Sequence, residues 1–195
     1  GSLNGDDGPI YLIGAKSGWS GNRLPGDYVR KYFNVTNVDF EAGTYDVEDE
    51  RGKRFWITGR TEMADNKDSG LMVFTAGWSC YKFSNIPHDQ TADEYSEIAG
   101  TQEYSDIDFP LIRLGEIHLI YAEACMHAGG SAATQLEALA ARAGVEAPAV
   151  VDEDFLIAER ARELMWEGHR RTDLIRFGKF TSKDFPWPFK GGSFQ

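Results

Sequence analysis

Apolar residues recur at helical spacing through residues 109–180, and this region organises the sequence. Its first run predicts an amphipathic helix, because apolar positions repeat at steps of three and four. Asp108 can cap this helix, Pro110 suits its first turn, and Gly129-Gly130 would end it. The stripe expected to face a core is Leu114, Ile117, Tyr121, Ala124, Cys125 and Ala128.

Three further short helices are predicted in the same region. The second covers residues 131–142 and stops at Gly144, the third starts near Asp152, and the fourth follows Gly168. Short helices joined by tight glycine turns predict a helical bundle or an array of hairpins. The first two helices also alternate large and small residues in the manner of a tetratricopeptide unit.

Residues 3–108 have a different pattern, in which Gly, Asn and Asp separate short apolar runs. Residues 25–33 predict a short helix. The strand-like runs are residues 11–13, 54–58, 71–75 and 81–83. The expected fold class is therefore mainly α, with long loops and a few short strands, and the composition shifts near Asp106.

Charged residues in the helical region alternate with large apolar ones such as Ile120 and Trp166. They form either a solvated face held by weak pairs at helical spacing, or an ion-paired layer buried between helices. The apolar neighbours favour the second interpretation, with Glu116, Glu163 and Arg170 as its most buried members. The candidate structural ion pairs involve Arg113, Glu116, Glu159, Arg160, Glu163, Glu167, Arg170, Asp173 and Arg176.

Two stretches of the helical region carry a family pattern. Residues 113–124 read RLGEIHLIYAEA and residues 159–176 read ERARELMWEGHRRTDLIR. Together they resemble the C-terminal signature of SusD/RagB-type nutrient-binding proteins. Upstream, Asp49-Glu50-Arg51 resembles the family's Asp-x-Arg, and residues 81–83 resemble its Tyr-Lys-Phe. Residues 139–144 depart from the pattern, because the family usually has Asn-x-x-Arg before Arg-Ala-Gly.

The resemblance implies a function and a location. Members are outer-membrane lipoproteins, so it implies a non-catalytic subunit that captures an oligosaccharide or other nutrient at the cell surface. The partner it implies is a SusC-like TonB-dependent transporter, to which the ligand is delivered. It further implies a SusD-like fold, with tetratricopeptide-like hairpins packed against a loop-rich region. Membrane attachment would come only through a lipid anchor that is absent from this chain.

The domain organisation follows from the same resemblance. Gly1-Ser2 has the look of a scar from a removed expression tag. Residues 3–108 form the loop-rich region and the candidate ligand surface, residues 109–180 the helical signature, and residues 181–195 a tail. The chain is expected to be the C-terminal portion of a longer SusD-like protein.

Composition and motifs exclude several other functions. A net charge of −11 argues against nucleic-acid binding, which needs clustered Lys and Arg. No dinucleotide or phosphate-cradling motif is present, so no cofactor is expected. The four histidines are spread out along the sequence and do not pair at metal-ligand spacing. The acidic run at residues 46–50 lacks the glycine of a calcium loop, so a solvated turn is favoured there. No metal site is therefore expected. Cys125 is most simply a small core residue, and a disulfide with Cys80 stays open.

Carboxylates raise the possibility of a glycoside hydrolase, which needs one carboxyl group of raised pKa beside an ionised one. The best-placed acids are Glu116, Glu163, Glu167 and Asp173, and each has an arginine close by in the sequence. A neighbouring guanidinium lowers a carboxyl pKa and prevents its use as a proton donor. No catalytic residue is therefore predicted. The alternatives are a helical-repeat interaction module without glycan binding and, less favoured, a glycoside hydrolase.

Aromatic residues in loops are the candidate ligand contacts. Sugar rings present apolar C–H faces, which Trp stacks on, while Asn and Arg bind the hydroxyls. Trp19 with Asn22 and Arg23 fits this description best, and Trp78 fits it less well. The competing interpretation is that such aromatics fill small cores under loops. Trp56, which alternates with Phe55 in a strand-like run, is expected in the core.

Overall fold

The computed structural model describes residues 23–62, 76–80, 82–83 and 108–182, which fall into two compact units. Among these residues, the first unit holds 23–47, 54–62, 76–80, 82–83 and 108. The second holds 48–53 and 109–182. Six residues from the first half of the chain are therefore part of the helical unit. The predicted strands at residues 11–13 and 71–75 lie outside the described residues.

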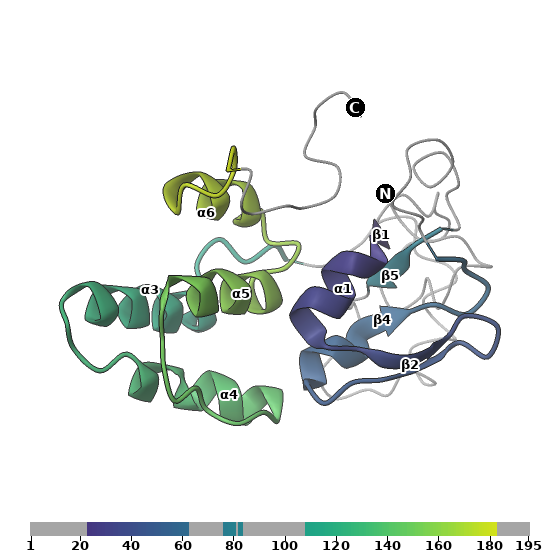
Figure 1. Ribbon diagram of the computed structural model, residues 1–195, viewed down its shortest axis with the longest axis horizontal. Coiled ribbons are helices and arrows are strands. Elements are labelled where there is room, and N and C mark those ends of the chain that lie inside the picture. Colours follow the sequence, from purple (N-terminus) through teal and green to yellow (C-terminus); the bar gives the residue numbers. More distant parts are fainter. Residues whose placement is uncertain (1–22, 63–75, 81, 84–107, 183–195) are drawn as a thin grey trace. The chain divides into compact units, whose positions relative to one another are not determined.

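The first unit combines one helix with short strands (Figure 1). Strands β1 (Arg23–Leu24), β5 (Trp78–Cys80) and β4 (Phe55–Trp56) form an antiparallel sheet in the order β1-β5-β4. Strands β2 (Thr36–Asp39) and β3 (Thr44–Asp46) form a separate antiparallel pair. Helix α1 (Gly26–Phe33) follows Pro25 and ends at Asn34, whose φ of 51° is left-handed. The predicted helix at residues 25–33 is confirmed.

An aromatic core fills the first unit. The Trp78 side chain is fully buried, with its ring in edge contacts to Phe40, Tyr45 and Phe55 at centroid distances of 5.8, 5.0 and 5.9 Å. The Tyr45 hydroxyl donates to the Phe55 carbonyl and accepts from the Phe55 amide. Edge-to-face geometry at these distances is the favoured arrangement of aromatic pairs. The prediction that Trp56 lies in the core is wrong, because Trp56 is only half-buried and its neighbour Phe55 is the buried residue.

The second unit is helical. It contains α3 (Leu114–His127), the 3₁₀ turn η3 (Ala133–Leu136), α4 (Glu137–Ala143), α5 (Glu153–Glu163) and α6 (Arg170–Arg176). The 3₁₀ turn η2 (Glu50–Arg54) contributes most of its residues to this unit. With five α-helices and only short strands among the described residues, the prediction of a mainly α fold is confirmed.

Two helix ends in this unit show common capping chemistry, whereas the prediction that Asp108 caps the first helix is wrong, because Arg113 occupies the N-cap position of α3. Asp152 caps α5, since its carboxylate accepts from the Phe155 amide at 2.8 Å. Gly144 ends α4 at a φ of 67°, in the left-handed region that glycine adopts at little cost. The predicted starts near Asp152 and after Gly168, and the stop at Gly144, are confirmed. The second predicted helix begins instead with the 3₁₀ turn η3.

The first predicted helix of this unit is wrong in two respects. Residues 108–113 are not helical, and Arg113, in extended backbone, occupies the N-cap position of α3. The predicted core stripe is also largely exposed: Leu114 by 69%, Ile117 by 45% and Tyr121 by 55%.

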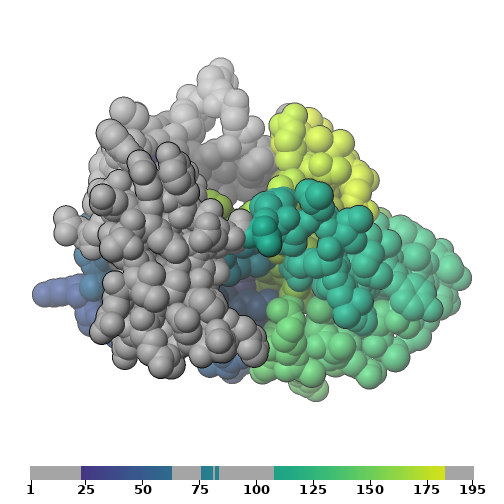
Figure 2. Space-filling view, turned by 180° about the vertical axis from the view of Figure 1, so that it is seen from behind, coloured from purple at the N-terminus to yellow at the C-terminus, as the bar shows by residue number. Residues whose placement is uncertain are grey.

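The buried side of α3 is instead carried by Leu119 and Ala122, which are fully buried. They join a core made of Ala132, Leu136, Leu139, Leu156 and Leu164, with Cys125 and Met126 packed against it. Residues near the start of α3, drawn in teal, lie on the molecular surface (Figure 2). Since α3 is apolar on more than one side, helical spacing alone did not identify the side that packs.

Candidate functional site

A cluster of charges surrounds Glu163, the last residue of α5. Its side chain is 1% exposed and accepts hydrogen bonds from Arg51, Arg113 and Arg142. The Arg51 Nη1 lies 2.9 Å from Glu163 Oε2. Three guanidinium groups on one carboxylate replace the water that burial removes, which is the condition for keeping a buried charge.

Arg113 joins the start of α3 to the end of α5. Its Nε and Nη2 donate to the two Glu167 carboxylate oxygens at 2.6 and 2.7 Å, the bidentate geometry that suits a guanidinium. Its Nη2 also donates to the Glu163 carbonyl at 2.6 Å. That carbonyl is at the C-terminal end of a helix, where positive charge is favourable. Arg113 therefore fastens two helices through side-chain and backbone acceptors.

Arg51 reaches the same cluster from residues 48–53. Its Nε and Nη2 donate to the Asp49 carboxylate at 2.9 and 2.7 Å, and its Nη1 donates to Glu159 Oε1 at 2.7 Å. Asp49 and Glu159 are each 6% exposed. The solvated turn expected at residues 46–50 is therefore wrong for Asp49, because this carboxylate is buried against its own arginine.

These contacts determine the protonation of the cluster. Burial alone would raise the pKa of Glu163, but the Arg113 hydrogen bond, the charges of Arg142 and Arg113 and the Arg51 hydrogen bond lower it from 4.5 to about 2. Burial tends to lower the pKa of Arg51 and Arg113, and their carboxylate partners overcome this and raise it. Glu163 is thus ionised at neutral pH and cannot serve as a general acid.

The predicted ion-pair residues divide into two groups. The structure pairs Arg113, Glu159, Arg160, Glu163, Glu167, Asp173 and Arg176 with opposite charges. The expected burial of Glu163 is confirmed. The expected burial of Glu116 and Arg170 is wrong, because both side chains are half-buried. Glu116 has His169 as its partner at 3.5 Å, and Arg170 donates to the Ile157 carbonyl at 2.9 Å. Sequence reasoning missed Arg51 and Arg142, although Asp49-x-Arg51 had been noticed as a motif.

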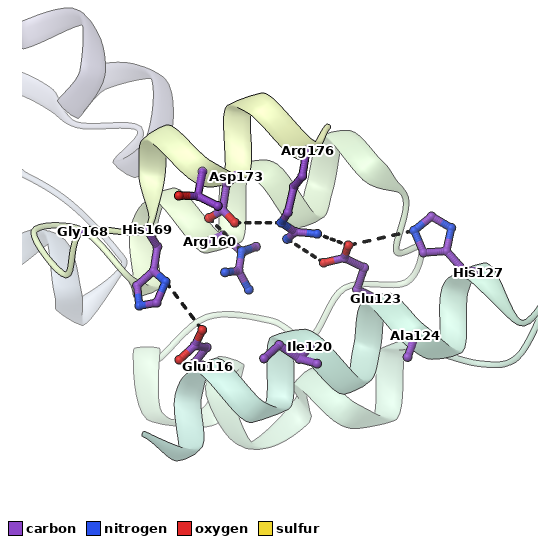
Figure 3. A pocket seen from close by; sticks show the side chains of 11 residues that line it. Glu116, Ile120, Glu123, Ala124, His127, Arg160, Gly168, His169, Asp173 and Arg176 are labelled. Atoms are coloured by element: carbon purple, nitrogen blue, oxygen red, sulfur yellow. Dashed lines mark hydrogen bonds and ion pairs between the residues drawn. The ribbon is translucent and has the colours of Figure 1, made fainter. Parts of the chain in front are cut away.

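A pocket of about 480 Å³ lies between α3 and α6 (Figure 3), within the ~300–1,000 Å³ of typical ligand sites. We refer to it as the α3–α6 pocket. Ile120 and Ala124 of α3 form an apolar part of its wall, and Thr172 of α6 adds a hydroxyl. Residues with ionisable side chains make up much of the rest: Glu116, Glu123, His127, Arg160, His169, Asp173 and Arg176.

A chain of ion pairs crosses the pocket. Arg176 Nη2 donates to Glu123 Oε2 at 2.8 Å and its Nε to Asp173 Oδ1 at 3.1 Å. The Glu123 hydrogen bond, opposed by burial and supported by Asp173, raises the pKa of Arg176. The other Asp173 oxygen lies 2.8 Å from Arg160 Nε. Glu123 connects α3 to α6 in this way and was absent from the predicted pairs.

Arg160 occupies an unusual position in this chain. Its side chain is 4% exposed, and its guanidinium points from beneath α6 into the space above Ile120 (Figure 3). The buried Nη1 atom has no hydrogen-bond acceptor among the residues the structure describes. An unpaired buried donor of this kind costs about 1–3 kcal/mol, and more when it is charged.

Of the four predicted ligand residues, the structure describes Arg23 and Trp78. Trp19 and Asn22 lie outside the described residues. Arg23 is half-buried on β1, and burial lowers its pKa. The assignment of Trp78 as a sugar-stacking residue is wrong, because its ring is fully enclosed by the aromatic core of the first unit. It is one of the core-filling aromatics that the competing interpretation described.

Within the described ranges, no three His, Cys, Asp or Glu side chains are grouped so as to hold a metal ion. Cys80 and Cys125 are both free thiols. No helix in the described part of the chain is long and apolar enough to cross a membrane.

Comparison with known proteins assigns the family. The family model described as the SusD family matches residues 15–194 of the 195. The chain belongs to the SusD family. A curated SusD relative, the "Starch-binding protein SusD" of Bacteroides thetaiotaomicron, is 38% identical over 136 residues. That match covers 69% of this chain and 23% of the relative, so the chain spans about a quarter of the length of the SusD protein it matches.

Proposed function

We propose that this chain is part of a non-catalytic glycan-binding subunit of an outer-membrane nutrient-uptake system. The observation that carries the proposal is the 38% identity to a protein named for starch binding, on top of the family match to residues 15–194. In this proposal the subunit captures an oligosaccharide at the cell surface. A SusC-like TonB-dependent transporter receives it, and a lipid anchor holds the subunit at the outer membrane.

The charge arrangement supports binding without catalysis. A glycoside hydrolase requires a carboxyl group whose pKa is raised so that it can protonate the leaving oxygen. The most buried glutamate of the helical unit has the opposite property, since three arginines lower its pKa to about 2. Glu163 is therefore not available for proton donation. Its neighbours Glu159 and Glu167 are held in ion pairs with Arg51 and Arg113, respectively.

The test is a titration of the purified protein with starch oligosaccharides by calorimetry, followed by measurement of reducing ends released over a day. We expect saturable binding with no release above a no-protein blank. Release of reducing ends at a steady rate would instead establish a hydrolase. Trp19→Ala, at the predicted stacking residue, is expected to weaken binding at least tenfold, by analogy with hot-spot aromatic residues whose removal costs about 2 kcal/mol.

A second candidate function is a protein-interaction module without glycan binding. The exposed apolar side chains of α3, including Leu114, Ile117 and Tyr121, favour it, because exposed apolar patches commonly mark interaction surfaces. The same calorimetric titration separates the two candidates. An interaction module would give no heat with any starch oligosaccharide, so Trp19→Ala would have no binding to lose.

A further inference from the structure

We propose that the α3–α6 pocket binds one neutral sugar ring, as a subsite separate from the predicted loop residues around Trp19. The proposal takes the ligand class from the proposed glycan-binding function, while the site itself is inferred from the geometry of the pocket. Its volume of about 480 Å³ leaves space for a ring with part of its neighbour, on the scale of sites for small ligands.

The first argument is the unsatisfied donor. Arg160 is buried, points into the pocket, and has an Nη1 without an acceptor among the described residues (Figure 3). The Asp173 carboxylate lies 2.8 Å from Arg160 Nε, on the other side of the guanidinium, in an ion pair whose geometry leaves Nε without a hydrogen bond to these residues as well. A hydroxyl oxygen of a bound ligand would supply the missing acceptor. Leaving such a donor unpaired is costly, so a ligand that pairs it recovers that cost on binding.

The second argument is a partly free acceptor on the opposite wall. Glu116 is contacted by His169 Nδ1 at 3.5 Å, which is longer than a normal N–H···O hydrogen bond. Glu123, by contrast, is held by two Arg176 nitrogens. The Glu116 carboxylate can therefore accept from a ligand hydroxyl. A ligand between α3 and α6 would then meet a donor on one side and an acceptor on the other.

Charge balance identifies the ligand class. Two arginines and three carboxylates line the pocket, which leaves one negative charge when the histidines are neutral. An anionic ligand is repelled by this balance, and a cationic ligand would leave the Arg160 donor unpaired. A neutral polyhydroxyl ligand satisfies both groups, because each hydroxyl can donate and accept. A sugar ring is such a ligand.

The apolar part of the wall fits the same ligand. Ile120 and Ala124 are four residues apart on α3, so they lie on one side of the helix, and both are exposed. Ile120 lies beneath the Arg160 guanidinium, and Ala124 continues this small apolar strip one turn along α3, toward His127 (Figure 3). A sugar ring would place the C–H groups of one face on this strip and direct its hydroxyls toward Arg160 and Glu116.

The experiment uses the whole chain, labelled with ¹⁵N, and follows backbone amide shifts of Ile120 and Thr172 by NMR. The probes are maltotriose, cellotriose and mannotriose, with glucuronic acid and glucosamine as charged comparisons. We expect saturable shifts at both amides with at least one neutral trisaccharide, and weaker responses to both charged sugars. Absence of shifts at these amides with all three trisaccharides would overturn the proposal, and so would a stronger response to either charged sugar.

Two variants assign any shifts to the pocket without disturbing Arg160. Ala124→Phe fills the pocket from an exposed position, and Glu116→Gln keeps the shape of the side chain while weakening its acceptor. We expect at least tenfold weaker pocket binding for the first and roughly tenfold for the second, since a hydrogen bond to a charged carboxylate is stronger than one to a neutral amide. The matched control is Ala141→Phe, at an exposed position on α4 that does not line the pocket. Equal loss in Ala124→Phe and this control would contradict the assignment.

The outcome also separates this proposal from the proposed function. If Trp19→Ala abolishes glycan binding and no pocket amide shifts in the unmodified chain, the glycan-binding function stands and the pocket subsite is wrong. If pocket shifts persist in Trp19→Ala and disappear in Ala124→Phe, the separate subsite is supported. If no glycan produces any shift or heat, both proposals fail together.

Discussion

Replacing Glu163 by Gln is the sharpest test of the buried charge cluster. The substitution keeps the size of a side chain that is 1% exposed and removes the negative charge that three arginines share. Removing one partner from a buried ion pair costs about 3–5 kcal/mol, because the remaining charges stay buried without compensation. An amide also donates hydrogen bonds, which places an N–H group against guanidinium donors.

The pKa of the Glu163 carboxyl group gives a second estimate of how much this side chain stabilises the fold. A pKa lowered from 4.5 to about 2 corresponds to ~3 kcal/mol of stability at neutral pH. Because the folded state holds this proton less tightly than the unfolded state, the contribution is complete above about pH 4.5 and is lost as pH falls through about 2. Glu163→Gln should therefore be less stable by about 3 kcal/mol at pH 7, and the difference should shrink in acid.

The assay is urea unfolding followed by far-UV circular dichroism, repeated between pH 7 and pH 2.5. At pH 7 the melting temperature should also fall by roughly 6–12 °C for a chain of this size. Glu146→Gln is the control, since Glu146 is exposed, and should change stability by less than about 0.5 kcal/mol. A loss below about 1 kcal/mol that does not vary with pH would refute the view that Glu163 is the centre of the cluster.

Three further predictions use other parts of the structure. Arg51→Met should lower the free energy of unfolding by about 3 kcal/mol. In a double-mutant cycle, Arg51→Met and Glu163→Gln together should lower it by less than the sum of the two single losses, and strict additivity would mean that the two side chains do not interact. Trp78→Ala should cost about 3–5 kcal/mol in urea unfolding while glycan affinity of the folded fraction stays unchanged, and a loss of affinity would restore Trp78 as a ligand contact. Asp152→Ala should lower the free energy of unfolding, measured by thermal unfolding, by about 1 kcal/mol. Asp152→Asn should lower it much less, because Asn also caps helices, and equal losses for the two variants would argue against capping.

Local chemistry accounts for the features that the sequence predicted well. The helix start near Asp152 and the helix stop at Gly144 were predicted, and the capping contacts at both ends join atoms within a few residues of each other. The family signature likewise lies in two continuous stretches, and the match to residues 15–194 confirms that identification. The start of α5 and the end of α4 were therefore predictable without tertiary information, whereas the start of α3 was not.

Other features depend on residues far apart in the chain. On α3 both Tyr121 and Ala122 belong to plausible apolar stripes, and only packing against Leu136 and Leu156 decides that Ala122 is the buried one. Trp78 was assigned to a loop because its aromatic neighbours, such as Tyr45, are distant in sequence. Trp19 and Asn22, the other candidate ligand contacts, lie outside the described residues, and their role stays a prediction.

The contribution of Arg51 to the helical unit has a consequence for the order of folding. Arg51 is 108 residues from Glu159 and 112 from Glu163, so these contacts have a very high sequence separation. Contacts of this kind form slowly, because a long loop must close before they stabilise anything. During synthesis, Arg51 and Asp49 leave the ribosome well before α5 exists, and the cluster can assemble only when the end of the chain arrives. The charge cluster should therefore form late, and its formation would couple the folding of the first half of the chain to completion of the last helices.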